Sequence, residues 1–163
     1  MAARETPVQA REGEALVWTD GACRRNPGPG GWAAIVVAPG GAAPVELTGG
    51  HPDTTNNRME YTAALEGLRS LPAGSRACVV TDSRLMLDSM TKWIAGWKRK
   101  GFKTAAGKPV ANQDLVLALD AEIARHTVVR WHWVRGHENG AAHAHKALND
   151  RADQLAVAAS HAS

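Results

Sequence analysis

The stretch from Ala15 to Gly31 constrains the fold most strongly, because a short apolar run meets a single acid and then a loop rich in turn residues. Residues 16–19 favour extended backbone, whereas the glycines and prolines of residues 21–31 disfavour a regular strand or helix. Asp20 is therefore predicted at the end of a strand. An ionised carboxylate there needs solvent, a cation or hydrogen-bond donors, because desolvating an unpaired charge costs free energy. The pattern makes Asp20 the first candidate site residue.

Length and composition favour one globular domain. The chain has 163 residues, 44% hydrophobic and 21% charged, and its net charge of +3 is mild evidence for an anionic partner. Cys23 and Cys78 form no CxxC pair, which favours a reducing compartment. No apolar run approaches the roughly 20 residues of a membrane span, and residues 1–13 lack the apolar core of a signal peptide. We expect a flexible leader over 1–13, a single domain over 14–160 and a cytoplasmic location.

Short β-prone runs and helical patterns follow one another along the chain. Asn56 and Asn57 offer a helix cap, and Pro72 and Gly74 end the helix that follows. The order of these segments predicts a mixed sheet with helices packed on it, in the α/β (α+β) class. The expected strands cover residues 16–19, 32–37, 45–48, 77–81 and 128–134, and the expected helices cover 59–71, 83–90, 115–123 and 145–159.

A basic segment at about 92–108 interrupts this order. Its lysines and arginine are interleaved with Trp93, Trp97 and Phe102, and no acid occurs from Ser89 to Gln113. Gly96, Gly101 and Gly107 are expected to break it into short pieces rather than one long helix. It should project as a basic, aromatic element.

Carboxylates recur where folds of this class build their sites. Asp20 and Asp82 follow β-prone runs, Glu60 lies in an early helical turn, and Asp150 or Asp153 lies on the closing helix. Oxygen ligands without Cys or His suit Mg²⁺ or Mn²⁺ better than Zn²⁺. Each acid alone could be an ordinary surface group or a helix-dipole partner. The four together indicate a divalent-metal site.

Four motifs in this sequence strongly resemble the bacterial type 1 ribonuclease H (ribonuclease HI) family. They are DGACRRNPGPGGW from Asp20, TTNNRMEYTAALEGL from Thr54, TDSRLMLDSMTKWIAGWKRKGFKT from Thr81, and WVRGH followed by NDRADQLA. Each is modest evidence alone, but their order and their acids make the set specific. The resemblance implies a five-stranded mixed sheet flanked by helices.

The resemblance also implies a mechanism. Asp20, Glu60, Asp82 and Asp153 match the family's metal-binding acids, which hold two Mg²⁺ ions, with Mn²⁺ a possible substitute. By this likeness Asp20 bridges both ions, Asp153 joins it at the nucleophile side, and Glu60 with Asp82 holds the leaving-group side. RNA is cut to leave 5′-phosphate and 3′-hydroxyl ends. His137 matches a loop histidine linked to proton transfer or product release.

The implied partner is an RNA/DNA hybrid, with no membrane and no obligate protein partner, so the protein is expected to act as a monomer. Basic side chains neutralise phosphates without reading sequence, and contacts to 2′-hydroxyls distinguish RNA from DNA. Trp97 and Phe102 are predicted to be structural. The expected hybrid-binding residues are Cys23, Asn26, Asn56, Asn57, Arg84, Trp93, Lys98, Arg99, Lys100 and Lys103.

Other classes of protein explain less of the sequence. A DNA transposase or resolvase could share the acids, but that class does not explain why the NNRME helix start and the basic segment occur in the same chain. A non-catalytic hybrid-binding module explains the basic segment but not the four acids. A glycosidase needs only two carboxylates and has no use for a basic arm.

Overall fold

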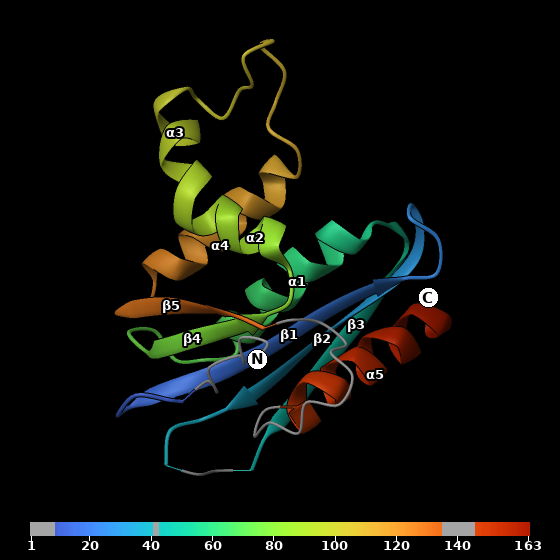
Figure 1. Cartoon of the computed structure of the whole chain (residues 1–163), viewed down its shortest axis with the longest axis vertical. Coiled ribbons are helices and arrows are strands. Elements are labelled where there is room, and N and C mark those ends of the chain that lie inside the picture. The colour runs from blue at the N-terminus through green and yellow to red at the C-terminus, as the bar shows by residue number, and fades with distance from the viewer. Residues whose placement is uncertain (1–8, 41–42, 135–145) are drawn as a thin grey trace, which may run out of the picture.

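A five-stranded mixed sheet forms the centre of the computed structural model, which describes residues 9–40, 43–134 and 146–163 (Figure 1). The strand order is β3-β2-β1-β4-β5. β1 pairs antiparallel with β2 and parallel with β4, so the mixed sheet predicted from the sequence is confirmed. The strands are β1 (Glu14–Cys23), β2 (Gly28–Val37), β3 (Val45–Thr54), β4 (Arg76–Thr81) and β5 (Val128–Trp133).

Helices cover both faces of this sheet. Figure 1 shows α5 along one face, where it lies against β1, β2 and β3, and α1 on the other face, where α4 packs against it. The basic segment rises from the α4 side of the molecule and carries α3. The helices are α1 (Asn56–Arg69), α2 (Arg84–Asp88), the π-helical turn η1 (Ser89–Trp93), α3 (Ile94–Arg99), α4 (Gln113–Ala124) and α5 (Lys146–Ala162).

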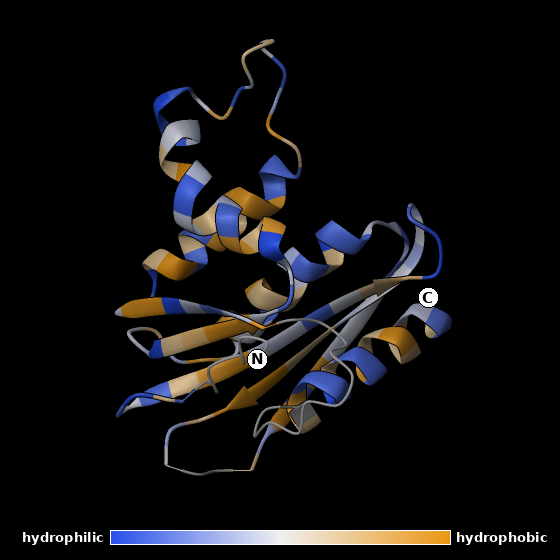
Figure 2. Ribbon diagram, in the orientation of Figure 1, coloured by the Kyte–Doolittle hydropathy of each residue, from blue (hydrophilic) through white to orange (hydrophobic). Residues whose placement is uncertain are grey.

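The alternation of side chains along the strands creates two apolar layers. Val17 and Val79 belong to the larger layer under α1 and α4, whereas Trp18 and Val80 belong to the layer that includes Ala152 of α5. Figure 2 shows the corresponding hydrophobic colour concentrated on the central strands, while the β1–β2 turn and the end of α3 are hydrophilic. The apolar layers fix β1, the strand that carries Asp20, from both sides.

The predicted strand end at Asp20 is wrong. β1 continues to Cys23 because its antiparallel pairing with β2 extends from Asp20↔Ala33 to Cys23↔Gly30. The parallel pairing with β4 stops earlier, at Trp18↔Val80. Asp20 therefore lies just beyond the parallel pair, where β1 still has a partner on one side only.

The predicted break of the basic segment at Gly96 is also wrong, whereas the predicted break at Gly101 is confirmed. α2, η1 and α3 run without interruption from Arg84 to Arg99, and Gly96 lies inside α3. Ile94 and Trp97 pack against the larger apolar layer, and this burial offsets the roughly 1 kcal/mol that a helical glycine costs. The break comes at Gly101, whose positive φ of 66° suits a glycine.

The start of α1 is capped one residue earlier than expected. Thr55 is the cap, and its hydroxyl accepts a hydrogen bond of 3.2 Å from the N–H of Arg58. Asn56 and Asn57 are instead the first residues of the helix. The carbonyl of the Asn26 side chain accepts a 3.0 Å hydrogen bond from the N–H of Asn56, which ties the β1–β2 turn to this helix start.

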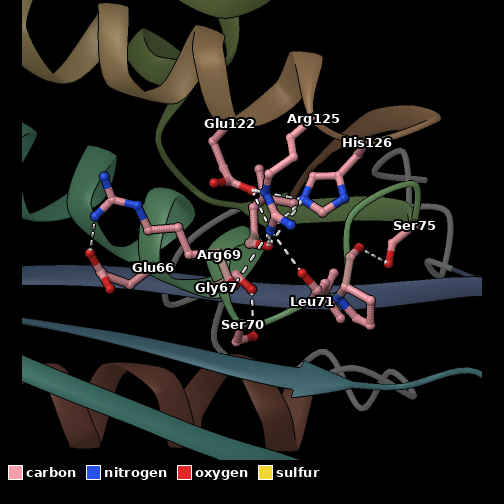
Figure 3. Close-up of polar contacts among 11 residues, drawn as sticks. Glu66, Gly67, Arg69, Ser70, Leu71, Ser75, Glu122, Arg125 and His126 are labelled. Atoms are coloured by element: carbon pink, nitrogen blue, oxygen red, sulfur yellow. Dashed lines mark hydrogen bonds and ion pairs between the residues drawn. The ribbon is translucent and has the colours of Figure 1, made fainter.

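The other end of α1 is held by two side chains at the end of α4 (Figure 3). The Arg125 guanidinium donates to the carbonyls of Leu68 at 3.3 Å and Leu71 at 2.8 Å. The carboxylate of Glu122 lies 2.7 Å from Arg125 and 2.9 Å from Nε2 of the buried His126. These contacts satisfy carbonyls that a helix end leaves unpaired, and they fix α1 relative to α4.

Candidate active site

Three carboxylates from three different elements converge beside the end of the β1–β4 pair. Asp20 of β1, Glu60 of α1 and Asp82, which follows β4, each offer an oxygen, and these oxygens lie within 4.8 Å of one another. Asp20 is 4% exposed and Glu60 is 8% exposed, while Asp82 is half-buried. We refer to these three residues as the carboxylate cluster.

Gly21 explains how α1 comes so close to β1. A Cβ at this position would lie 2.7 Å from the backbone nitrogen of Glu60 and 2.8 Å from the Cβ of Met59. Only a glycine lets the first turns of α1 pack directly on the strand, which brings Glu60 beside Asp20. Asp82 arrives by a shorter route, because β4 is the parallel neighbour of β1 and ends at Thr81.

Asp153 of α5 adds a fourth charge next to the cluster. Trp18 and Asp20 are two residues apart on β1 and therefore point to the same face of the sheet, where Ala152 packs against Trp18. Asp153 follows Ala152, and its charge contributes to the raised pKa of Asp20. This contribution supports Asp153, rather than its neighbour Asp150, as the fourth acid.

Burial and mutual repulsion disfavour ionisation of the cluster. Burial raises the pKa of the Asp20 carboxyl from 3.8 to about 8, and the charges of Asp82 and Asp153 add to this rise. Burial likewise raises the pKa of Glu60 well above its usual value, with further contributions from Asp20 and Asp82. The N–H of Gly21 donates to Asp20 at 2.8 Å, which offsets only part of the effect. Without a cation, the protonated form of Asp20 is favoured at neutral pH, and ionisation of Glu60 is likewise disfavoured.

The cluster fits a hard divalent cation. Oε2 of Glu60 is buried and has no hydrogen-bond partner among the described residues, so it is available as a ligand. All three groups of the cluster are carboxylates, which suit Mg²⁺ or Mn²⁺, and a bound cation would relieve the repulsion that raises their pKa values.

The predicted phosphate-binding cations lie on α3 and just after it, away from the carboxylate cluster. Arg99, Lys100 and Lys103 are exposed. Lys98 is exposed too, but its ammonium lies 3.0 Å from the Asp120 carboxylate of α4 and must leave it to meet a phosphate. Trp93 is 43% exposed, and its ring centroid lies 6.1 Å from that of Trp97.

The predicted 2′-hydroxyl contacts surround the cluster on the β1–β2 turn and the start of α1. Asn26, Asn56 and Asn57 are exposed there. The thiol of Cys23 is instead turned inward, with the carbonyls of Gly28 and Thr54 at 3.4 and 3.5 Å. Contacts from Cys23 to a ligand would therefore come from its backbone.

Arg84 is held beside the cluster by an aromatic ring that the sequence did not reveal as its partner. Its guanidinium carbon lies 5.4 Å from the ring centroid of Trp133, a cation–π contact. The Trp133 indole in turn donates to the carbonyl of Asp82 at 3.2 Å. The two residues are 49 positions apart in the chain and meet because Thr81 and Trp133 pair across β4 and β5.

Two other predictions lie wholly or partly outside the described residues. His137 belongs to residues 135–145, and residues 1–8 of the expected leader are also outside the description. Within the described part of that leader, the carbonyl of Gln9 accepts a 3.0 Å hydrogen bond from Arg130, whose guanidinium also binds Glu14 at 2.6 Å.

The sequence interpretation missed two arginines. Arg24 and Arg25 line a hollow of about 280 Å³ together with Pro29, in the turn that follows Asp20. The signal is a pair of adjacent arginines inside a glycine- and proline-rich loop, which is much weaker than the longer run of cations at 92–108.

The fold and the site define an α/β protein with a buried carboxylate site suited to divalent cations. Residues 12–161 match the family model described as RNase H, and the chain belongs to the ribonuclease H family. It is 53% identical over 142 residues to ribonuclease H of Alkalilimnicola ehrlichii, covering 85% of this chain and 89% of that protein. It is 49% identical over 140 residues to ribonuclease HI of Pseudomonas syringae pv. tomato, covering 86% and 87%. The resemblance found in the sequence is confirmed.

Solved structures share the fold. LC9-RNase H1, a type 1 RNase H with the type 2 active-site motif, superposes with a TM-score of 0.76 at 32% identity over 95% of this chain and 75% of that one. LC11-RNase H1, solved in complex with an RNA/DNA hybrid, superposes with a TM-score of 0.65 at 20% identity over 91% and 97% of the two chains. The ribonuclease H fold inferred from the sequence is confirmed.

Proposed function

We propose that this chain is an endonuclease that hydrolyses the RNA strand of RNA/DNA hybrids, largely without regard to sequence, and leaves 5′-phosphate and 3′-hydroxyl ends. The observation that carries the proposal is the convergence of Asp20, Glu60 and Asp82 in a chain of the ribonuclease H family. The names of the relatives, and the hybrid bound to LC11-RNase H1, support the same substrate.

The proposed cofactor is a pair of Mg²⁺ ions, with Mn²⁺ as a possible substitute, held by Asp20, Glu60, Asp82 and Asp153. Such ions supply an activated water and stabilise the charge that develops on the leaving oxygen. The chain itself keeps the carboxylates converged and largely dry, through Gly21 and the packing of α1. His137 is proposed to assist proton transfer or product release.

The hybrid is proposed to lie across the cluster, with its minor groove near the asparagines at the start of α1 and a phosphate backbone on the basic segment. Asn26, Asn56 and Asn57 expose donors and acceptors for 2′-hydroxyls. Arg84, whose guanidinium lies against the ring of Trp133, is proposed to contact the hybrid close to the cut.

The proposed setting is the cytoplasm, and the proposed active form is a monomer. Cys23 and Cys78 are both free thiols, which supports a reducing compartment. In the described part of the chain, no helix is long and apolar enough to cross a membrane. Size-exclusion chromatography with light scattering tests the monomer, and a dimer at assay concentration contradicts it.

Cleavage of an end-labelled RNA/DNA hybrid tests the function. The expected result is Mg²⁺-dependent cutting of the RNA strand, with no cutting of matched duplex DNA or duplex RNA and none in chelator. Product ends are assigned by comparing their mobility and their response to phosphatase with synthetic standards. Cutting of duplex DNA at a comparable rate, or cutting of the hybrid in chelator, would overturn the proposal.

A further inference from the structure

We propose that Arg24 and Arg25 form a second phosphate-binding site, which grips the backbone of the bound hybrid close to the carboxylate cluster and separately from the basic segment. This inference rests on the proposed function, because it takes an RNA/DNA hybrid as the ligand. It assigns a role to two residues of the β1–β2 turn that neither the acids nor the basic segment explains.

The two guanidiniums are free to take an anion. Both side chains are exposed and line the hollow of about 280 Å³ with Pro29. Neither has an ion-pair or hydrogen-bond partner for its guanidinium among the described residues. Six other arginines of the described chain lie within 3.5 Å of a carboxylate, whereas Arg11, Arg76 and Arg99 are exposed and, like Arg24 and Arg25, form no ion pair among the described residues; the six are Arg58, Arg69, Arg84, Arg125, Arg130 and Arg151.

The turn that carries them is fixed in place. The N–H of Arg24 donates to the carbonyl of Pro29 at 2.8 Å, which closes the turn. A Cβ at Gly28 would lie 2.8 Å from the Cβ of Arg25, so the turn is as tight as its glycine permits. The bond between Asn26 and the N–H of Asn56 anchors it to the start of α1. A turn whose backbone is already fixed loses less conformational entropy on binding than a free loop does.

The position of the turn relates it to the reaction. Arg24 follows Asp20 by four residues, and a strand rises about 3.4 Å per residue, so Arg24 lies within roughly 14 Å of Asp20. Phosphates of one strand rise about 3.4 Å per nucleotide along a duplex axis, so a hybrid bound at the cluster has phosphates at distances of this order from the cut. Figure 1 shows the β1–β2 turn and α3 well apart, so one phosphate group cannot serve both sites.

Charge chemistry identifies the ligand as a phosphodiester. A guanidinium fork binds phosphate oxygens in a bidentate manner, and two adjacent forks can share the two free oxygens of one phosphodiester or bind two neighbouring phosphodiesters. A contact to phosphate positions the hybrid without reading its sequence.

The test compares two double variants with equal loss of charge in an Asp20→Asn background that binds without cutting. The test variant is Arg24→Ala with Arg25→Ala. The control is Arg11→Ala with Arg76→Ala. These two exposed arginines lie near the opposite end of β1, where the backbone of Glu14 is the strand partner of Arg76. Hybrid affinity is measured by fluorescence anisotropy from 50 to 400 mM salt, and thermal melting checks that each variant is folded.

For the test variant we expect affinity to fall at least about tenfold at 0.1 M salt, and the slope of log affinity against log salt to fall by about 1 to 2, one phosphate being worth about 0.9. The control should change the slope by much less, since its charges lie far from the ligand. Arg24→Lys with Arg25→Lys should recover the slope but only part of the affinity, because a lysine lacks the bidentate fork.

A test variant that matches its control in affinity and slope overturns the inference. Its failure is distinguishable from failure of the proposed function. If the parent with intact Asp20 cuts the hybrid in Mg²⁺ but the arginine variant binds normally, only this inference is wrong. If the parent does not cut the hybrid at all, the proposed function is wrong as well.

Discussion

Replacing Asp20 by Asn should abolish cleavage and, in metal-free protein, raise stability. The burial and neighbouring charges that raise the pKa of Asp20 from 3.8 to about 8 make its ionised form costly in the folded state. At pH 7 the folded protein keeps this carboxyl protonated, whereas the unfolded chain releases the proton. Asn resembles the protonated carboxyl in shape, but it does not have to take up a proton when the chain folds, so this free-energy cost of folding is removed.

The magnitude follows from the pKa values. Each pH unit between the unfolded pKa and the folded pKa changes the free energy of unfolding by about 1.4 kcal/mol. At pH 7 about three units lie above the unfolded pKa of 3.8, so the gain in stability has a ceiling of about 4 kcal/mol. Asp82 and Asp153 share in the repulsion that raises the pKa of Asp20, and these interacting groups titrate together, so we expect about half of this ceiling, about 2 kcal/mol. For a chain of this size that corresponds to a rise of roughly 4–8 °C in Tm.

The sign of the pH dependence is specific. A carboxyl whose folded pKa is raised contributes stability that is fully present below the unfolded value of 3.8 and is lost as pH rises towards about 8. The Asp20→Asn variant escapes this loss. Its advantage over the parent should therefore be near zero at pH 4 and largest at pH 8 and above, and saturating Mg²⁺ should reduce or reverse it by stabilising the parent.

Chemical denaturation in chelator at pH 4, 6 and 8 measures the effect, and Asp114→Asn provides the matched control. Asp114 forms an exposed ion pair of 2.7 Å with Arg58, which lowers the pKa of Asp114. Its contribution has the opposite sign: it is present above the unfolded pKa and lost as pH falls, and the control should lose under about 1 kcal/mol at pH 8. An Asp20→Asn gain that is absent at pH 8, or equal at pH 4 and pH 8, would refute the reasoning.

Other perturbations have outcomes that can be checked separately. Replacing four cations of the basic segment by Ala should lower the salt slope of hybrid affinity by up to about 0.9 per phosphate while sparing single-turnover cleavage at saturating hybrid; these cations are Lys98, Arg99, Lys100 and Lys103. Gly21→Ala should push α1 off β1 and lose both cleavage and about 1–3 kcal/mol of stability, whereas Gly96→Ala, whose Cβ would meet only a flexible side-chain end at 3.7 Å, should keep both. His137→Ala should slow turnover and alter its pH profile without abolishing cleavage, and an unaltered profile would reduce His137 to an ordinary loop residue. Arg125→Ala should cost about 1–3 kcal/mol in denaturant melts, because carbonyls at the end of α1 lose their donor, and an unchanged midpoint would count against that role.

The sequence predicted the elements better than their ends. Short apolar runs rich in β-prone residues located every strand of the sheet, because a strand buried on one or both faces needs such residues. The length of β1 was underestimated because glycines normally end strands, and the antiparallel pairing with β2 that carries β1 to Cys23 is a tertiary effect. The helical continuity through Gly96 was missed for the same reason, since packing of Ile94 and Trp97 outweighs local propensity.

Contacts between distant segments explain what the sequence could not give in the site itself. The acids were visible as residues, but only the parallel pairing of β1 with β4 and the glycine-dependent approach of α1 bring Asp20, Glu60 and Asp82 within 4.8 Å. The partner of Lys98 was equally hidden, because Asp120 lies on another helix and the local sequence shows only unopposed positive charge. A run of cations in a sequence therefore overstates the positive charge that is free to bind. Arg24 and Arg25 become informative only once the structure shows which arginines have carboxylate partners and that this unpaired couple lies on the turn that follows Asp20.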